Sequence, residues 1–133
     1  MNANLAKIAQ TCLEGAETDT MTFPRIVDTL MREGFESYAI DFRRATATYY
    51  LPDGDSIVLP AHRGEVPIPD ALDIAAVRAA IAEAQQLVRG YTYAGFCAKV
   101  MAAGCAGYIV SFTGRRAVYF GRTAETHVEH FPR

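Results

Sequence analysis

Apolar residues along this chain recur first at helical spacing and then at strand spacing, and this succession occurs twice. A stripe at i, i+3, i+4, i+7 and i+8 predicts one helix that follows Thr22 and another that follows Thr92. Gly34 and Gly104 stand where a left-handed residue ends a helix, so we expect a positive φ at both. The two stripes are Phe23, Ile26, Val27, Leu30 and Met31, and Tyr93, Phe96, Cys97, Val100 and Met101.

Each of these helices is followed by residues that alternate between apolar and polar, which is typical of strands. Short turn sequences separate the alternating runs, the strongest being Pro52, Asp53 and Gly54. The predicted strands cover residues 38–42, 46–51 and 56–59, and again 108–112, 116–120 and 126–131.

A further amphipathic stretch precedes each unit, at residues 5–13 and 74–88. For the second stretch we predict Asp70 as the N-cap and an end just before Gly90. The unit is therefore two helices and a three-stranded meander, used twice. This pattern predicts an α+β fold with a mostly antiparallel sheet and helices packed on one face.

When the sequence is aligned with itself at an offset of 70 residues, positions 22–50 match positions 92–120 without a gap. This agreement predicts an internal duplication with pseudo-twofold symmetry inside a single domain of 133 residues. The alternative is a chance likeness between two helix-strand units. The first repeat is expected at residues 1–60, the crossover at 61–69 and the second repeat at 70–133. The identical pairs are Thr22/Thr92, Met31/Met101, Gly34/Gly104, Tyr38/Tyr108, Phe42/Phe112, Ala47/Ala117 and Tyr49/Tyr119.

Composition excludes several classes of protein. A net charge of −2 argues against sequence-independent nucleic-acid coating, which needs many phosphate-neutralising cations. No apolar run reaches the roughly 18 residues of a membrane span, so no membrane partner is expected. Met1 opens directly into an amphipathic segment without a leader, which predicts a cytoplasmic protein. Cys12, Cys97 and Cys105 are an odd number, which favours reduced thiols.

Polar residues that replace apolar ones between the repeats are candidates for function. His127 and Glu129 stand where the first repeat has Ile57 and Leu59, and on a strand they share one face while His130 lies on the other. The pair can act as an acid–base couple, or as two metal ligands that lack a third. The alternative is an exposed edge strand whose charges discourage aggregation. No metal site and no cofactor are predicted.

Charge is the second difference between the repeats, because no acidic residue occurs between Glu83 and Glu125. Arg115, Arg116 and Arg122 fall in this stretch and can converge on a phosphate or carboxylate. The alternative is ordinary solvation of exposed turns. By contrast, the tyrosines recur in both repeats, which predicts core packing with hydroxyls that reach the rim; they are Tyr38, Tyr49, Tyr108 and Tyr119.

The C-terminal residues resemble a known family. The runs AGCAGY at 103–108, GRR at 114–116, YFGRT at 119–123 and ETHVEHFP at 125–132 are similar to the C-terminal signature of the YbcV-like family. This family comprises small bacterial and prophage-encoded proteins, also labelled phage envelope protein-like. The resemblance implies no activity, cofactor or catalytic residue.

Two functional classes remain open. The first is a binding or regulatory module that presents a groove between its halves to a small anionic ligand or a partner protein. The alternative is a small hydrolase- or lyase-like enzyme that uses His127 and Glu129. The candidate ligand-binding residues are therefore His127, Glu129, Arg115, Arg116 and Arg122.

Overall fold

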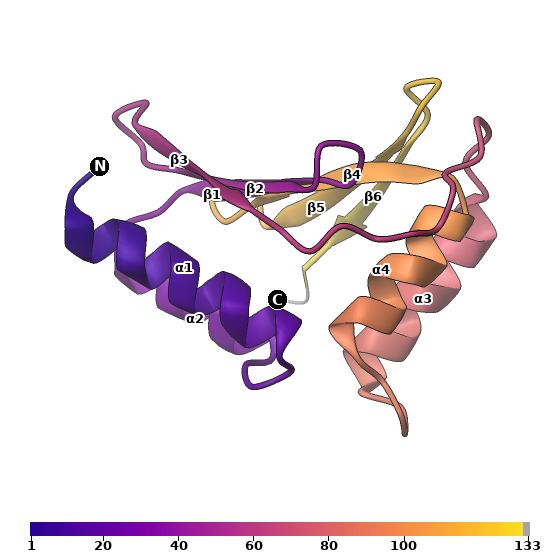
Figure 1. The fold of residues 1–133 in the computed structure, drawn as a ribbon, viewed down its shortest axis with the longest axis horizontal. Helices are drawn as coiled ribbons and strands as arrows, with labels where there is room; N and C mark the ends of the chain where they lie inside the picture. The colour runs from indigo at the N-terminus through magenta and orange to yellow at the C-terminus, as the bar shows by residue number, and fades with distance from the viewer. Residues whose placement is uncertain (132–133) are drawn as a thin grey trace.

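A computed structural model of the chain describes residues 1–131; Pro132, where the C-terminal run ends, and Arg133 lie outside the described residues. The elements follow the predicted order of two helices and three strands, twice over (Figure 1). They are α1 (Ala3–Glu17), α2 (Phe23–Arg32), β1 (Ser37–Asp41), β2 (Thr46–Tyr50), β3 (Ser56–Pro60), α3 (Ile74–Gln86), α4 (Tyr93–Ala102), β4 (Cys105–Ser111), β5 (Arg116–Gly121) and β6 (Thr126–His130).

The strands form one antiparallel sheet in the order β3-β2-β1-β4-β5-β6. The two halves meet where β1 pairs with β4, and Ala39 lies opposite Ile109, which is 70 positions further along. On either side, Ser37 pairs with Ser111 and residue 41 pairs with residue 107. The strand order and this register are those of a pseudo-twofold arrangement centred on the Ala39–Ile109 pair. The fold is therefore α+β with the predicted antiparallel meanders.

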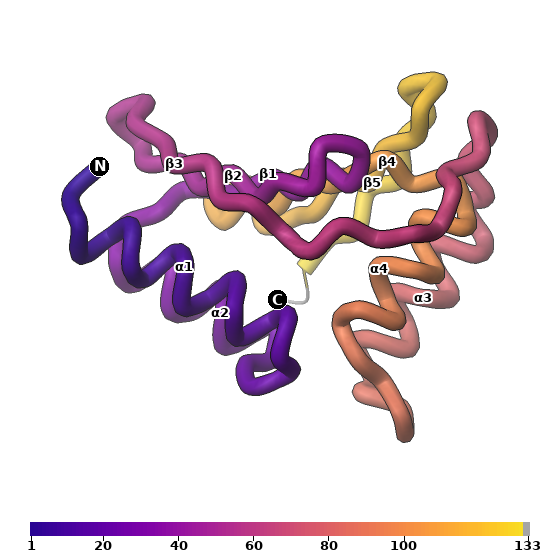
Figure 2. The backbone as a smooth tube through the Cα atoms, in the orientation of Figure 1, coloured from indigo at the N-terminus to yellow at the C-terminus, as the bar shows by residue number. Residues whose placement is uncertain are grey.

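Both helix pairs lie on the same side of the sheet, and they approach each other as they run away from it (Figures 1 and 2). Helix α1 packs against α2, and α3 packs against α4. The crossover between β3 and α3 runs along the sheet in front of the helices. The other face of the sheet carries exposed apolar side chains, among them Val58, Ile109 and Val128. Among the described residues, none of the helices has the length and hydropathy to cross a membrane.

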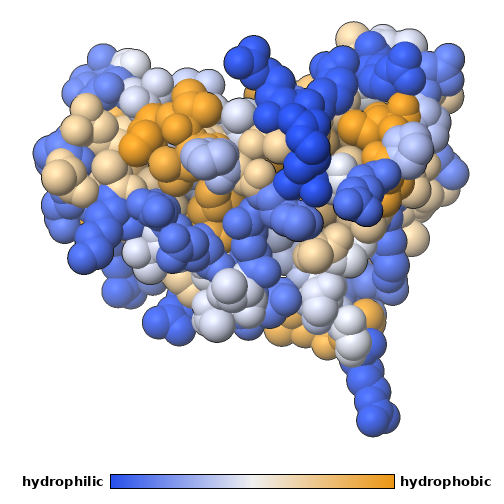
Figure 3. Space-filling view, viewed as in Figure 1, coloured by the Kyte–Doolittle hydropathy of each residue, from blue (hydrophilic) through white to orange (hydrophobic). Residues whose placement is uncertain are grey.

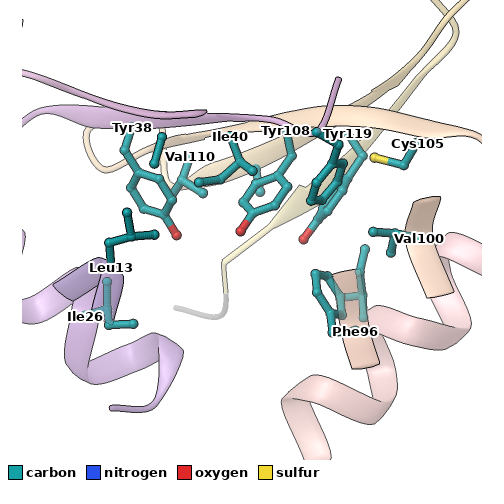
Figure 4. Packing of buried hydrophobic residues seen from close by; sticks show 14 of the residues in the cluster. Leu13, Ile26, Tyr38, Ile40, Phe96, Val100, Cys105, Tyr108, Val110 and Tyr119 are labelled. Atoms are coloured by element: carbon teal, nitrogen blue, oxygen red, sulfur yellow. The ribbon is translucent and has the colours of Figure 1, made fainter. Parts of the chain in front are cut away.

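Alternation along the strands builds the core, because every second side chain points toward the helices. Tyr38, Ile40, Tyr108, Val110 and Tyr119 are buried there (Figure 4). From the helices, Leu30, Val77 and Val100 meet them and are fully buried. The repeated tyrosines therefore lie in the core, as the sequence predicts.

Two features of the helix stripes differ from the prediction. Ile26 and Leu30 are buried, but Phe23 and Met31 are 45% and 47% exposed. The equivalent Met101 is buried because the crossover passes over it, so that a Cβ on Gly64 would touch its sulfur. The apolar stripe of a helix does not show which of its residues a distant segment of the chain will bury.

The start and end of α3 also differ from the prediction. The N-cap is Asp73, whose side chain accepts a hydrogen bond of 3.1 Å from Ala76 N–H, and not Asp70. Leu72 is buried and donates its N–H to the Glu125 carboxylate at 3.1 Å, which holds the preceding residues outside the helix. The helix ends early, because Leu87 takes a left-handed conformation with φ of 46°. By contrast, the positive φ predicted at the two helix-ending glycines is confirmed, and it is 94° at each.

Candidate functional site

His127 and Glu129 lie on the edge strand β6 and point toward the helix layer, because they alternate with exposed residues. His127 Nε2 is 3.0 Å from Glu129 Oε2, and the two side chains are 14% and 30% exposed. Gln85 of α3 reaches the other oxygen, Glu129 Oε1, at 3.5 Å. The pair is thus half-buried between the sheet edge and α3, and the carboxylate orients the imidazole. His130 is exposed on the opposite face.

The structure does not gather the three candidate arginines. Arg116 pairs with His130 across β5 and β6, so its side chain lies on the face opposite His127 and Glu129. Arg122 follows the far end of β5, about 20 Å along the strand from Arg116 at about 3.3 Å per residue. There its Nη1 donates to the Ile68 carbonyl at 3.0 Å. Arg115 has φ of 51° in the hairpin, and its carbonyl accepts the Phe131 N–H at 2.8 Å.

Two cavities open between the helix pairs and the sheet. One, of about 430 Å³, lies among residues of the α1–α2 loop, the α3–α4 loop and the sheet. The other, of about 560 Å³, lies beneath the crossover, against α1 and α4. Leu13, Ile40 and Tyr93 line both, so the cavities adjoin, and we call them together the cleft. In the space-filling view, apolar surface shows on both halves between hydrophilic side chains (Figure 3).

Tyrosines form the polar part of the cleft floor. The hydroxyls of Tyr38, Tyr108 and Tyr119 point away from the sheet into the space between the helix pairs (Figure 4). The Tyr93 and Tyr108 hydroxyl oxygens are 2.7 Å apart, so one donates a hydrogen bond to the other. The rings of Tyr38 and Tyr49 stack at 5.5 Å, and those of Tyr108 and Tyr119 approach to 5.1 Å.

Burial keeps these phenols uncharged. It raises the pKa of Tyr38, Tyr93 and Tyr108 well above the ordinary value of 10.0, because a phenolate loses hydration in the interior. The hydroxyls therefore act as hydrogen-bond donors and acceptors at every physiological pH, and not as bases.

The ionisable side chains that line the cleft are almost all acidic. Asp19 lines the smaller cavity, and Glu17, Asp41, Glu65 and His62 line the larger one. Neither Arg nor Lys is among the lining residues of these two cavities. Asp19 accepts a hydrogen bond from the Tyr93 N–H at 2.9 Å, and Glu17 accepts one from the His62 N–H at 2.7 Å. These carboxylates therefore hold the backbone around the cleft and set its negative charge.

Comparison with known protein families matches residues 11–129 to a family model described as Protein of unknown function (DUF1398). The chain belongs to this family. No curated protein matches the sequence. The family extends over both halves of the fold, so it includes the residues that form the cleft.

The three cysteines of this DUF1398 protein have free thiols, and the pKa values of two of these thiols are strongly raised. Burial raises the pKa of Cys97 to about 12 and that of Cys105 to about 11, so neither is a thiolate at neutral pH. Within residues 1–131, no group of three or more His, Cys, Asp or Glu side chains is arranged to hold a metal ion.

The lining residues of the cleft could not be predicted from the sequence of this DUF1398 protein, because they come from both halves and from the crossover. A groove between the halves is expected from the symmetry, but its lining residues are not. The available signal was the recurrence of tyrosines at equivalent positions, since phenol hydroxyls in a core need polar neighbours.

Proposed function

We propose that this DUF1398 protein is a binding module whose small-molecule ligand occupies the cleft between the two helix pairs. The observation that carries the proposal is a group of tyrosines, among them Tyr38 and Tyr108, that lines the smaller of two adjoining cavities of about 430 and 560 Å³, while Tyr93 lines both. Ligand sites typically have volumes of about 300 to 1,000 Å³, with apolar walls and a few convergent polar groups. The cleft has this character.

A neutral apolar dye tests the proposal. N-phenyl-1-naphthylamine should gain fluorescence on binding, and Ala98→Phe should weaken binding at least about tenfold because the new ring fills the larger cavity. Ala102→Phe is the matched control, since Ala102 is exposed at the end of the same helix and does not line either cavity. Absence of dye binding, or equal effects of both variants, contradicts a site in the cleft.

The His127–Glu129 contact supports a second candidate function. The carboxylate of Glu129 orients the imidazole of His127, and such a couple can bind an anion or transfer a proton. The sequence proposes His127, Glu129, Arg115, Arg116 and Arg122 for this candidate, and the contact that supports it is the one between His127 and Glu129. Neither His127 nor Glu129 lines the cleft, but Gln85, which reaches Glu129, lines the smaller cavity, so the two sites are neighbours.

Phosphate provides the test of the second candidate. Under it, millimolar phosphate shifts the imidazole NMR signals of His127 in a saturable way and leaves those of His130 unchanged. Hydrolase or lyase activity lost in His127→Gln and retained in His130→Gln identifies an enzyme. If phosphate moves both imidazoles alike, the charges of β6 protect an exposed sheet edge.

Three broader assignments complete the proposal. We infer that an internal duplication produced the two halves, with repeats at 1–60 and 70–133 within a single domain. We also propose that this chain is related to the YbcV-like proteins and shares their association with prophages. A cytoplasmic location is the third assignment.

A further inference from the structure

The polar atoms deep in the cleft belong to phenols, whereas its charged groups lie nearer the solvent. Tyr38, Tyr49 and Tyr108 line the smaller cavity and are at most 5% exposed. Asp19 and Glu65, by contrast, are exposed, and Glu17 and Asp41 are half-buried. A ligand that enters the cleft therefore meets neutral hydroxyls at its inner end and carboxylates only at its entrance.

The Tyr93–Tyr108 pair has hydrogen-bonding capacity left for a ligand. One hydroxyl donates to the other, so one of the two hydroxyl hydrogens is not used between them. A chain of hydroxyls always has one more hydrogen than it has internal bonds. An oxygen acceptor in the cleft completes it.

A charged group at this depth has no partner of opposite sign in the lining. An anion loses its hydration, finds neither Arg nor Lys among the lining residues, and lies near several carboxylates. A cation finds its carboxylates only at the entrance, where Asp19 and Glu17 already accept hydrogen bonds from backbone N–H groups. An uncharged ligand avoids both penalties.

We infer that the cleft binds an uncharged small molecule with an aromatic or aliphatic body and a carbonyl or hydroxyl oxygen that hydrogen-bonds to the Tyr93–Tyr108 pair. This inference rests on the proposed binding function and names the chemical class of its ligand. The apolar body contacts side chains such as Leu13, Ile26 and Ile40, which lie around the same floor.

Three probes that share one ring system test the charge preference. We expect 2-acetonaphthone, which is neutral, to bind at least about tenfold more tightly than 2-naphthoate or 2-naphthylmethylammonium at neutral pH, as calorimetry measures. Tighter binding of either charged probe overturns the ligand class but leaves a binding site in the cleft. If none of the probes binds and the neutral dye fails as well, the binding function itself is wrong.

Variants that remove one hydroxyl test the hydrogen bond. Tyr108→Phe should weaken 2-acetonaphthone binding about three- to tenfold, the effect of one net hydrogen bond, and should leave naphthalene binding unchanged. Tyr93→Phe should act in the same way, and it replaces Tyr108→Phe if that variant does not fold. Tyr50→Phe is the control, because Tyr50 is exposed on the helix-free face. Unchanged ketone affinity in both the folded Tyr108→Phe and the folded Tyr93→Phe variant overturns the assigned contact.

Discussion

The carboxylate of Asp19 accepts a hydrogen bond of 2.9 Å from the backbone N–H of Tyr93, 74 positions away. Asp19 follows α1 in the first half, and Tyr93 is the first residue of α4 in the second. The first N–H groups of a helix have no partner within the helix, and its N-terminus favours negative charge. Thr92 satisfies Gly95 N–H from within the same half, whereas Asp19 reaches across to the other. This bond joins the halves beside the cleft.

Asp19→Gly should therefore destabilise the protein by about 1 kcal/mol in urea unfolding, because α4 loses an N-terminal acceptor while glycine adopts the φ of 56° without strain. Asp19→Asn keeps an oxygen at the same place and tolerates the φ of 56°, so it should remain close to the native stability. Asp28→Ala is the control, since it removes only an exposed pair with Arg32 and should cost under about 0.5 kcal/mol. Equal effects of Asp19→Gly and Asp28→Ala contradict the bridging role.

Gly34 and Gly104 have the same φ of 94° but different surroundings, so substitution should separate them. A Cβ at Gly34 meets nothing within 4 Å, whereas one at Gly104 collides with the carbonyl of Ala71. Gly34→Ala should lower the free energy of unfolding by about 1–2 kcal/mol, the strain of a left-handed alanine. Gly104→Ala adds a backbone clash and should be clearly worse in the same denaturation measurement. If the two variants lose the same free energy of unfolding, Gly104 is not more closely packed than Gly34.

Local patterns predicted most of this fold, and the misses have a common cause. The stripes, the helix-ending glycines and the alternating strands depend on neighbours in sequence, and the elements formed as expected. Burial of Met101 but not of Met31 depends on the crossover, and the α3 cap depends on Glu125, 53 residues from Leu72. Such contacts follow from the tertiary arrangement and leave no periodic signal.

The candidate site divides in the same way. Strand alternation correctly places His127 and Glu129 on one face, because period two is a local property. Whether the arginines converge is not a local property, because it depends on the hairpin geometry and on the length of β5. These place Arg116 and Arg122 at opposite ends of that strand. The cleft could not be predicted because its shape depends on how two separate helix pairs are arranged over one sheet.

Continuity of the sheet across the two halves predicts cooperative unfolding. The β1–β4 ladder joins them at the centre, and Tyr38 and Tyr108 contribute to one core with rings 6.4 Å apart. Tyrosine fluorescence and far-UV circular dichroism should therefore report one coincident urea transition, with equal calorimetric and van't Hoff enthalpies. Two separated transitions contradict the single-domain assignment.

The stability of the protein should fall as the pH rises above about 9. Burial raises the pKa of Cys97 to about 12 and that of Cys105 to about 11, from 9.0, and it also raises the pKa values of Tyr49 and Tyr119. In the unfolded chain these groups ionise near their ordinary values, so above pH 9 the unfolded state binds fewer protons than the folded state.

Stability contributed by these groups is thus complete below about pH 9 and is lost progressively toward pH 12. Urea midpoints measured at pH 7, 9, 10 and 11 should be lower at each step above pH 9. Cys97→Val, which places there the residue found at the equivalent position 27, should reduce that slope by up to one proton, because one of the ionising groups is gone. A midpoint that stays constant from pH 9 to 11 shows that the thiols and phenols ionise alike in both states and that the floor of the cleft is open to water.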